Sequence, residues 1–108
     1  MAGSKANHPP VVRLKGSKTI SAKPGSTVGL SGIVKDPDGD RTSNKWWPYE
    51  EVDSYPGKIA IMNPGKLITS FKVPNDAQAG QTIHLILEVK DSGSPGLTRY
   101  QRVVVNVM

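Results

Sequence analysis

The chain has 108 residues and no cysteine, so it is long enough for one domain with a single core and excludes a disulfide or a thiolate metal site. Glycine (11) and proline (9) are frequent, only 36% of residues are hydrophobic, and no run approaches the roughly 20 apolar residues of a membrane helix. The net charge of +5 comes from singly scattered lysines and arginines, so we expect a soluble protein that binds neither membrane nor nucleic acid.

Short segments of alternating apolar and polar residues follow one another, separated by turns rich in glycine, proline and aspartate. The predicted strands are, in chain order, 11–14, 19–22, 26–35, 42–50, 66–73, 81–90 and 97–107, with a short extended piece at 58–62. The clearest alternation gives four expected core residues, Ile83, Leu85, Leu87 and Val89. The pattern predicts an all-β fold, an Ig-like antiparallel β-sandwich of about seven strands. We expect residues 1–8 to be a linker or tail and residues 9–108 to be the domain.

Three aspartates alternate in the turn 36–40, whose sequence is DPDGD. An Ig-like topology brings this turn beside Asp91, and convergent carboxylates suit Ca²⁺. The turn is not an EF-hand, because Arg41 stands at the sixth position, where glycine is required, and Trp47 at the twelfth, where glutamate is required. A turn without an ion explains the same residues, since aspartates cap backbone N–H groups and Gly39 takes a positive φ. Two alternatives remain, a plain turn and a calcium site made of Asp36, Asp38, Asp40 and Asp91; no cofactor is required.

The predicted strand 42–50 carries both tryptophans of the protein, Trp46 and Trp47. Adjacent residues on a strand point to opposite faces, so only one of them can be in the core. If Trp46 points inward, an outer sheet face is formed by Trp47, Tyr49, His84, Glu88, Tyr100 and Arg102. Aromatic rings stack on the C–H faces of sugars while polar side chains bond the hydroxyls, so this face is a candidate carbohydrate platform. The alternative is that the 51–57 loop or a partner domain covers the aromatic rings.

The sequence lacks a constellation that could act as a catalytic site. His8 lies in the expected tail and His84 on a regular strand, where neither has a nucleophile and a carboxylate to orient it. Glu50 and Glu51 are adjacent and would diverge in a strand, whereas paired catalytic carboxylates must face a shared substrate. We therefore predict that the chain is not an enzyme.

Several strings resemble known bacterial modules. DPDGD at 36–40, VPNDAQAG at 73–80 and VKDSGSPGLTRY at 89–100 are similar to PKD-like and cadherin-like Ig modules. The longer strings WWPYEEVDSYPGKIAI and IHLILEVKDSGSPGLTRYQRVVV, which begin at Trp46 and Ile83, resemble the C-terminal domain of bacterial cellulose-binding proteins with a larger, nucleoside-hydrolase-like N-terminal part. The resemblance covers residues 9–107.

The resemblance implies that Trp46 is the inward tryptophan and that the chain is a non-catalytic accessory domain of a secreted or cell-surface protein. Its implied partners are cellulose or a related plant cell-wall glucan and an N-terminal hydrolase-like domain. Two hypotheses follow from it. In the first, the domain binds polysaccharide through the aromatic face; in the second, it is a spacer, stiffened by calcium, that packs on the hydrolase-like domain.

Overall fold

The computed structural model describes residues 9–37, 39, 41–93 and 96–108. The expected tail at 1–8 lies outside these residues. Within them the chain forms seven strands and one 3₁₀ turn: β1 (Val11–Leu14), β2 (Thr19–Ala22), β3 (Thr27–Lys35), β4 (Thr42–Pro48), η2 (Glu50–Val52), β5 (Ile68–Lys72), β6 (Thr82–Asp91) and β7 (Thr98–Val107). In this described part, no helix has the length and apolar character needed to cross a membrane.

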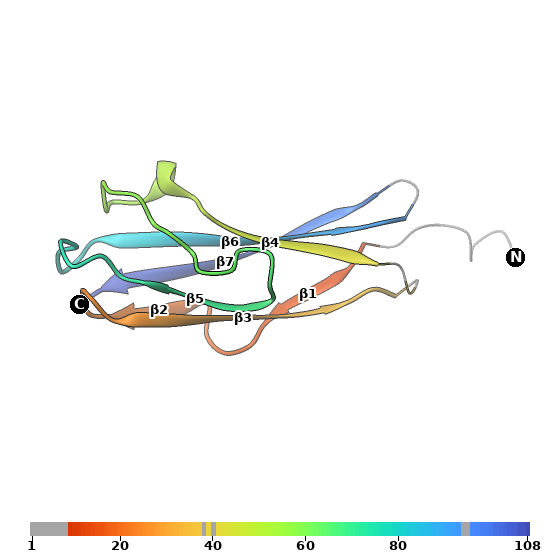
Figure 1. The fold of residues 1–108 in the computed structure, drawn as a ribbon, viewed down its shortest axis with the longest axis horizontal. Coiled ribbons are helices and arrows are strands. Elements are labelled where there is room, and N and C mark those ends of the chain that lie inside the picture. Colours follow the sequence, from red (N-terminus) through yellow and green to blue (C-terminus); the bar gives the residue numbers. More distant parts are fainter. Residues whose placement is uncertain (1–8, 38, 40, 94–95) are drawn as a thin grey trace, which may run out of the picture.

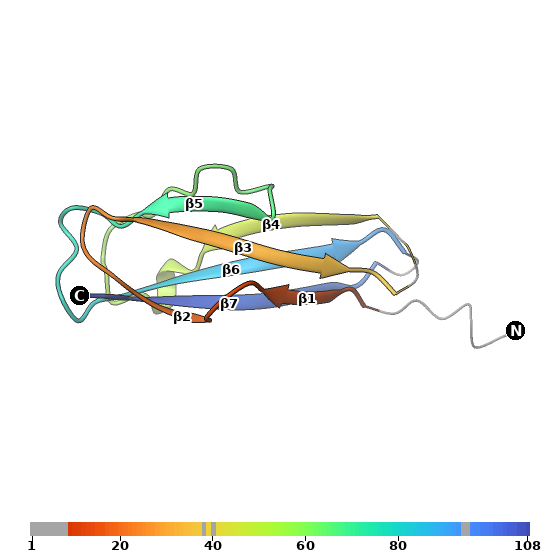
Figure 2. The same ribbon diagram turned by 90° about the horizontal axis from the view of Figure 1, so that it is seen from below.

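Two sheets pack face to face as a sandwich (Figures 1 and 2). One has the order β1-β3-β5 and the other the order β2-β7-β6-β4. The paired strands are antiparallel except β2 and β7, which run parallel. This architecture confirms the predicted Ig-like sandwich. The extended piece expected at 58–62 is reduced to one isolated bridge, between Ile61 and Phe71.

The core lies between the sheets and follows the alternation of the sequence. The largest fully buried side chains are Trp46, Phe71, Leu30, Ile83, Leu85, Leu87, Val73, Val89 and Val105. Trp46 is only 1% exposed, and its indole N–H donates to the carbonyl of Leu67 at 3.3 Å. Because Trp46 is the central core tryptophan, strand geometry turns Trp47 outward.

The turn after β3 and the turn after β6 lie at the same end of the sandwich, as predicted. The backbone N–H of Ser92 donates to the carbonyl of Arg41 at 2.8 Å, which joins the two turns. β1 starts at this end too, because Val11 pairs with Lys35 at the end of β3. In Figure 1 this end carries the N-terminal side of the chain, while the C-terminus lies at the opposite end.

Candidate functional site

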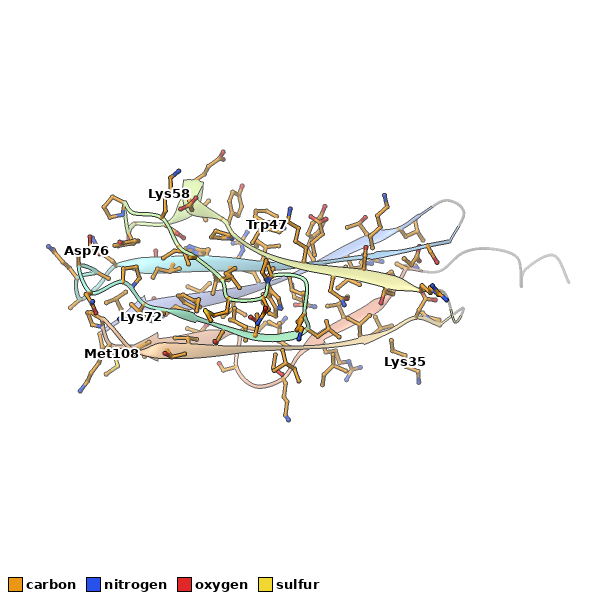
Figure 3. All side chains as sticks on the ribbon, in the orientation of Figure 1. Lys35, Trp47, Lys58, Lys72, Asp76 and Met108 are labelled. Carbon is orange, nitrogen blue, oxygen red and sulfur yellow. The ribbon has the colours of Figure 1, made fainter. Side chains whose placement is uncertain are left out.

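The larger sheet places the predicted site residues in register on its outer face. Trp47 pairs with Ile86, and Ile86 pairs with Arg102 on the next strand. The three neighbouring rows across the sheet are Lys45, Glu88 and Tyr100; Trp47, Ile86 and Arg102; and Tyr49 and His84. In Figure 3 Trp47 projects from the outer side of the sheet, away from the core. The parity predicted for the two tryptophans is therefore confirmed.

An open hollow of about 710 Å³ lies on this face, a size typical of ligand sites. Its lining residues are Trp47, Pro48, Tyr49, Glu50, Glu51, Ile86, Tyr100 and Arg102. Ile86 faces outward yet is only 6% exposed, so its neighbours on the same face cover it. The hollow thus has an apolar floor, aromatic rings beside it and charged groups at its margin.

The rings in the hollow are not parallel. The ring centroids of Trp47 and Tyr49 are 5.6 Å apart, and the ring planes are tilted by 58°. The guanidinium carbon of Arg102 lies 6.0 Å from the centroid of the Tyr49 ring, at the outer limit of a cation–π contact. Tyr100 is 57% exposed, whereas Trp47 and Tyr49 are only partly exposed. The face is hollowed, and its rings point in different directions.

Residues 49–51 line one side of the hollow, and the 49–55 segment that carries them, called the wall below, is bonded to β6. The backbone N–H of Tyr49 donates to the carbonyl of His84 at 2.9 Å, which extends the ladder one residue beyond β4. The chain then makes the single turn η2, which stands out from the sheet in Figure 1. It returns to β6 where the N–H of Thr82 donates to the hydroxyl of Ser54 at 2.7 Å. Both ends of the wall are thereby fixed to one strand.

The side chain of Asp53 connects this wall to His84 on β6. Its Oδ1 accepts the backbone N–H of His84 at 2.6 Å and lies 3.0 Å from the ring Nδ1 of the same histidine. A carboxylate oxygen only accepts, so this contact places the proton of a neutral His84 on Nδ1. The Asp53 side chain is fully buried, and its Oδ2 has no hydrogen-bond partner among the described residues. Asp53 therefore fixes the position of the wall through a buried carboxylate.

Replacing Asp53 with alanine is expected to lower the free energy of unfolding by about 1–3 kcal/mol, because two donors of His84 lose their acceptor. Asp53→Asn is the matched control, since its amide oxygen retains an acceptor for the backbone N–H. Urea unfolding followed by tryptophan fluorescence measures both variants. Equal stability of Asp53→Ala and wild type would show that the two bonds do not hold the wall.

Tyr55 anchors the chain directly after the wall. Its hydroxyl donates to Asp76 Oδ1 at 2.7 Å, and this bond, with a smaller effect of burial, raises the pKa of Tyr55 above its ordinary value of 10.0. A raised pKa means that folding favours the neutral phenol. The stabilisation is complete below pH of about 10 and is lost as the pH rises through the folded-state pKa.

We therefore expect Tyr55→Phe to be less stable than wild type at pH 8, with the difference shrinking as the pH is raised above about 10. Urea unfolding of both proteins across this range gives the comparison. Because the other titrating groups are shared, they cancel in the difference. A difference that stays constant with pH would contradict the role of this hydrogen bond.

Not all of the six predicted carbohydrate-binding residues line the hollow. Four of them line the hollow: Trp47, Tyr49, Tyr100 and Arg102. Glu88 lies on the same face in the neighbouring row, between Lys45 and Tyr100, but does not line the hollow. His84 also does not line it, and its side chain is bonded to Asp53.

Sequence reasoning missed the residues of the wall. The predicted strand 42–50 ends at Pro48 instead, and Glu50 and Glu51 form a 3₁₀ turn in which both line the hollow. The available signal was their position directly after Tyr49 and after a proline, where a strand commonly ends. The role of Asp53 is not predictable from the sequence pattern, because its partner His84 lies 31 residues away in the chain.

The described residues leave the predicted calcium site untested, since Asp38 and Asp40 lie outside them. Asp91 is only 3% exposed, and its Oδ1 accepts the N–H groups of Gly93 and Leu97 at 3.1 and 3.0 Å. Gly39 has the expected positive φ, 74°. Asp91 thus accepts hydrogen bonds within its own turn, and calcium binding stays a prediction.

Calorimetric titration of wild type and of Asp36→Asn with Ca²⁺ tests this prediction. Binding heat that is present for wild type and absent for the variant would support a calcium site.

The fold places the chain in the class of Ig-like β-sandwich domains. The PKD domain from KIAA 1837 protein superposes with a TM-score of 0.59 and 20% identity, over 89% of this chain and 83% of that chain. Murine CRIg gives a TM-score of 0.59 with 14% identity, over 94% of this chain and 99% of that chain. At these identities the likeness concerns the fold alone.

Residues 27–107 match the family described as cellulose-binding protein Sde0182, C-terminal domain, and the chain belongs to this family. A solved protein from Saccharophagus degradans, a nucleoside hydrolase-related hypothetical protein associated with carbohydrate metabolism, is 39% identical with a TM-score of 0.91. The alignment covers 97% of this chain and 27% of that protein, so this chain spans about a quarter of its relative. None of the curated proteins matches the chain.

Proposed function

We propose that the chain is a non-catalytic accessory module that binds cellulose or a related plant cell-wall glucan through the hollow of the β4-β6-β7 face. The observation that carries this proposal is the convergence of Trp47, Tyr49 and Tyr100 on one open hollow, beside Arg102. Membership of a family described as cellulose-binding supports the same conclusion.

Binding by this face combines stacking with hydrogen bonding. The C–H surface of a pyranose ring lies against an aromatic ring, while Arg102 donates to hydroxyls and the glutamates of the wall accept from them. Ring contacts of this kind contribute about 0.5–1.5 kcal/mol each beyond the area that they bury, so affinity per site is modest. A modest site is sufficient for a module that keeps a hydrolase-like domain near an insoluble substrate, in a secreted or cell-surface protein.

A second candidate function, that of a spacer packed on a hydrolase-like domain, is favoured by the exposed apolar residues of the opposite sheet and its border. Ile33 on β3, Ile68 on β5 and Met62 in the preceding loop are 52%, 73% and 73% exposed. Ile68 pairs with Ser31, two residues before Ile33, so the two isoleucines share the outer face of this sheet and are available to a partner domain. A partner domain on this sheet would leave the aromatic face free, so contact through this sheet and glycan binding through the hollow are separable by mutation.

The test is retention of the chain on amorphous cellulose, microcrystalline cellulose and insoluble xylan, with and without Ca²⁺. We expect retention of wild type, weaker retention of Tyr100→Ala and unchanged retention of Ile68→Ser, the matched control on the opposite sheet. Reducing-end release in the same samples should equal that of a blank. Absence of retention on every material would contradict the proposal and leave the spacer as the function.

A further inference from the structure

We infer that the hollow takes a single hydrated glycan chain, such as a disordered cellulose strand or a soluble oligosaccharide, and not the flat face of a crystal. This inference rests on the proposed function and adds the physical form of the ligand. It depends on three features of the hollow: the tilt of its rings, the contact that Arg102 makes, and its wall.

The tilt of the rings is the first reason. All pyranose rings on a crystalline face lie in parallel planes, and a rigid plane can lie flat against only one of two rings that are tilted by 58°. The glycosidic bonds of a free chain rotate, so neighbouring sugars can turn to face different rings. Trp47 and Tyr49 can therefore both stack on a single chain and cannot both stack on a crystal.

The second reason is that Arg102 stands over the Tyr49 ring. Its guanidinium carbon lies 6.0 Å from the ring centroid, so a sugar that stacks on Tyr49 must fit beside this side chain. Tyr49 and Trp47 are also only partly exposed. Rings recessed beside an apolar floor are accessible to a narrow chain, whereas a broad flat surface would meet the margins of the hollow first.

The wall is the third reason. Glu50 and Glu51 are exposed and line the hollow on the turn η2, with Arg102 across the sheet. These groups bond hydroxyls at the edges of a sugar ring. In a crystalline glucan the edge hydroxyls are bonded to neighbouring chains, but in a single chain they are hydrated and can exchange water for the side chains. The polar groups of the hollow therefore favour a chain with free edges.

The experiment measures wild type by calorimetry with cellobiose through cellohexaose, and then by retention on amorphous and microcrystalline cellulose with and without saturating cellohexaose. We expect affinity to rise with oligosaccharide length, and cellohexaose to release the protein from both solids. Tyr49→Ala should bind cellohexaose about tenfold more weakly, the loss of about one stacking contact. Ile68→Ser, on the opposite sheet, is expected to bind as wild type does.

The outcomes separate the inference from the proposed function. Retention on microcrystalline cellulose that cellohexaose does not reverse, or no binding of soluble oligosaccharides, would overturn the inference and leave the glycan-binding function standing. Failure to bind any soluble or solid glucan would overturn both. Because the decisive comparison uses wild type alone, it holds even if Tyr49→Ala proves unstable.

Discussion

Trp47→Ala is expected to lower the affinity for glucan by about thirtyfold or more, about 2 kcal/mol, which is the size of effect seen for an aromatic residue that carries much of the binding energy. Trp47 stands at the β4 end of the row that crosses the hollow, next to Ile86 and near Tyr49. Its ring lies outside the core, so the fold should survive with a loss of about 1 kcal/mol in unfolding free energy. Trp47→Ala is therefore expected to weaken glucan binding strongly and to lower stability only slightly.

The measurement is cellohexaose binding by calorimetry together with urea unfolding of the same preparation. Trp47→Phe is the graded control, because it retains a smaller ring that can still stack, and it should bind between wild type and the alanine variant. Unchanged affinity of Trp47→Ala would show that Trp47 does not contact the ligand and would contradict the assignment of the hollow as the glycan site.

Trp46→Ala should have the opposite profile. The residue is 1% exposed between the two sheets, and its removal leaves a large cavity that costs about 3–5 kcal/mol. The indole N–H that donates to the Leu67 carbonyl is lost as well. Since small domains have a total stability of about 5–15 kcal/mol, the variant should be close to unfolding at ordinary temperature.

Thermal and urea unfolding test this prediction, with Trp46→Phe as the variant that fills part of the cavity and recovers part of the stability. Trp46 and Trp47 form an internally matched pair: one residue type, adjacent in sequence, on opposite faces of one strand. If Trp47→Ala were the more destabilising of the two, the strand parity that defines the site would be wrong.

The sequence predicts the seven strands and the core faces of β6 and β7, although β4 ends at Pro48 and the piece at 58–62 is only a single bridge. These properties depend on alternation with a period of two, which is local and visible without knowledge of the partners. The inward faces of β6 and β7 and the outward position of Tyr100 followed from it, whereas the outward position of Trp47 and Tyr49 depended on the choice between the two tryptophans. The family resemblance then selected Trp46 as the core tryptophan.

Which residues of the outer face form the hollow, and how the rings are tilted, depends on contacts between segments that are distant in sequence. Glu50 and Glu51 join Trp47 and Tyr49 because the segment after β4 leaves the sheet as η2 and returns to β6. That path is fixed by Asp53, which contacts His84 far away in sequence. Because of this contact, His84 is bonded to Asp53, although its position on the outer face predicts that it binds the ligand. Alternation records which side of a strand a residue occupies, but the shape of a site depends on long-range hydrogen bonds and packing between segments.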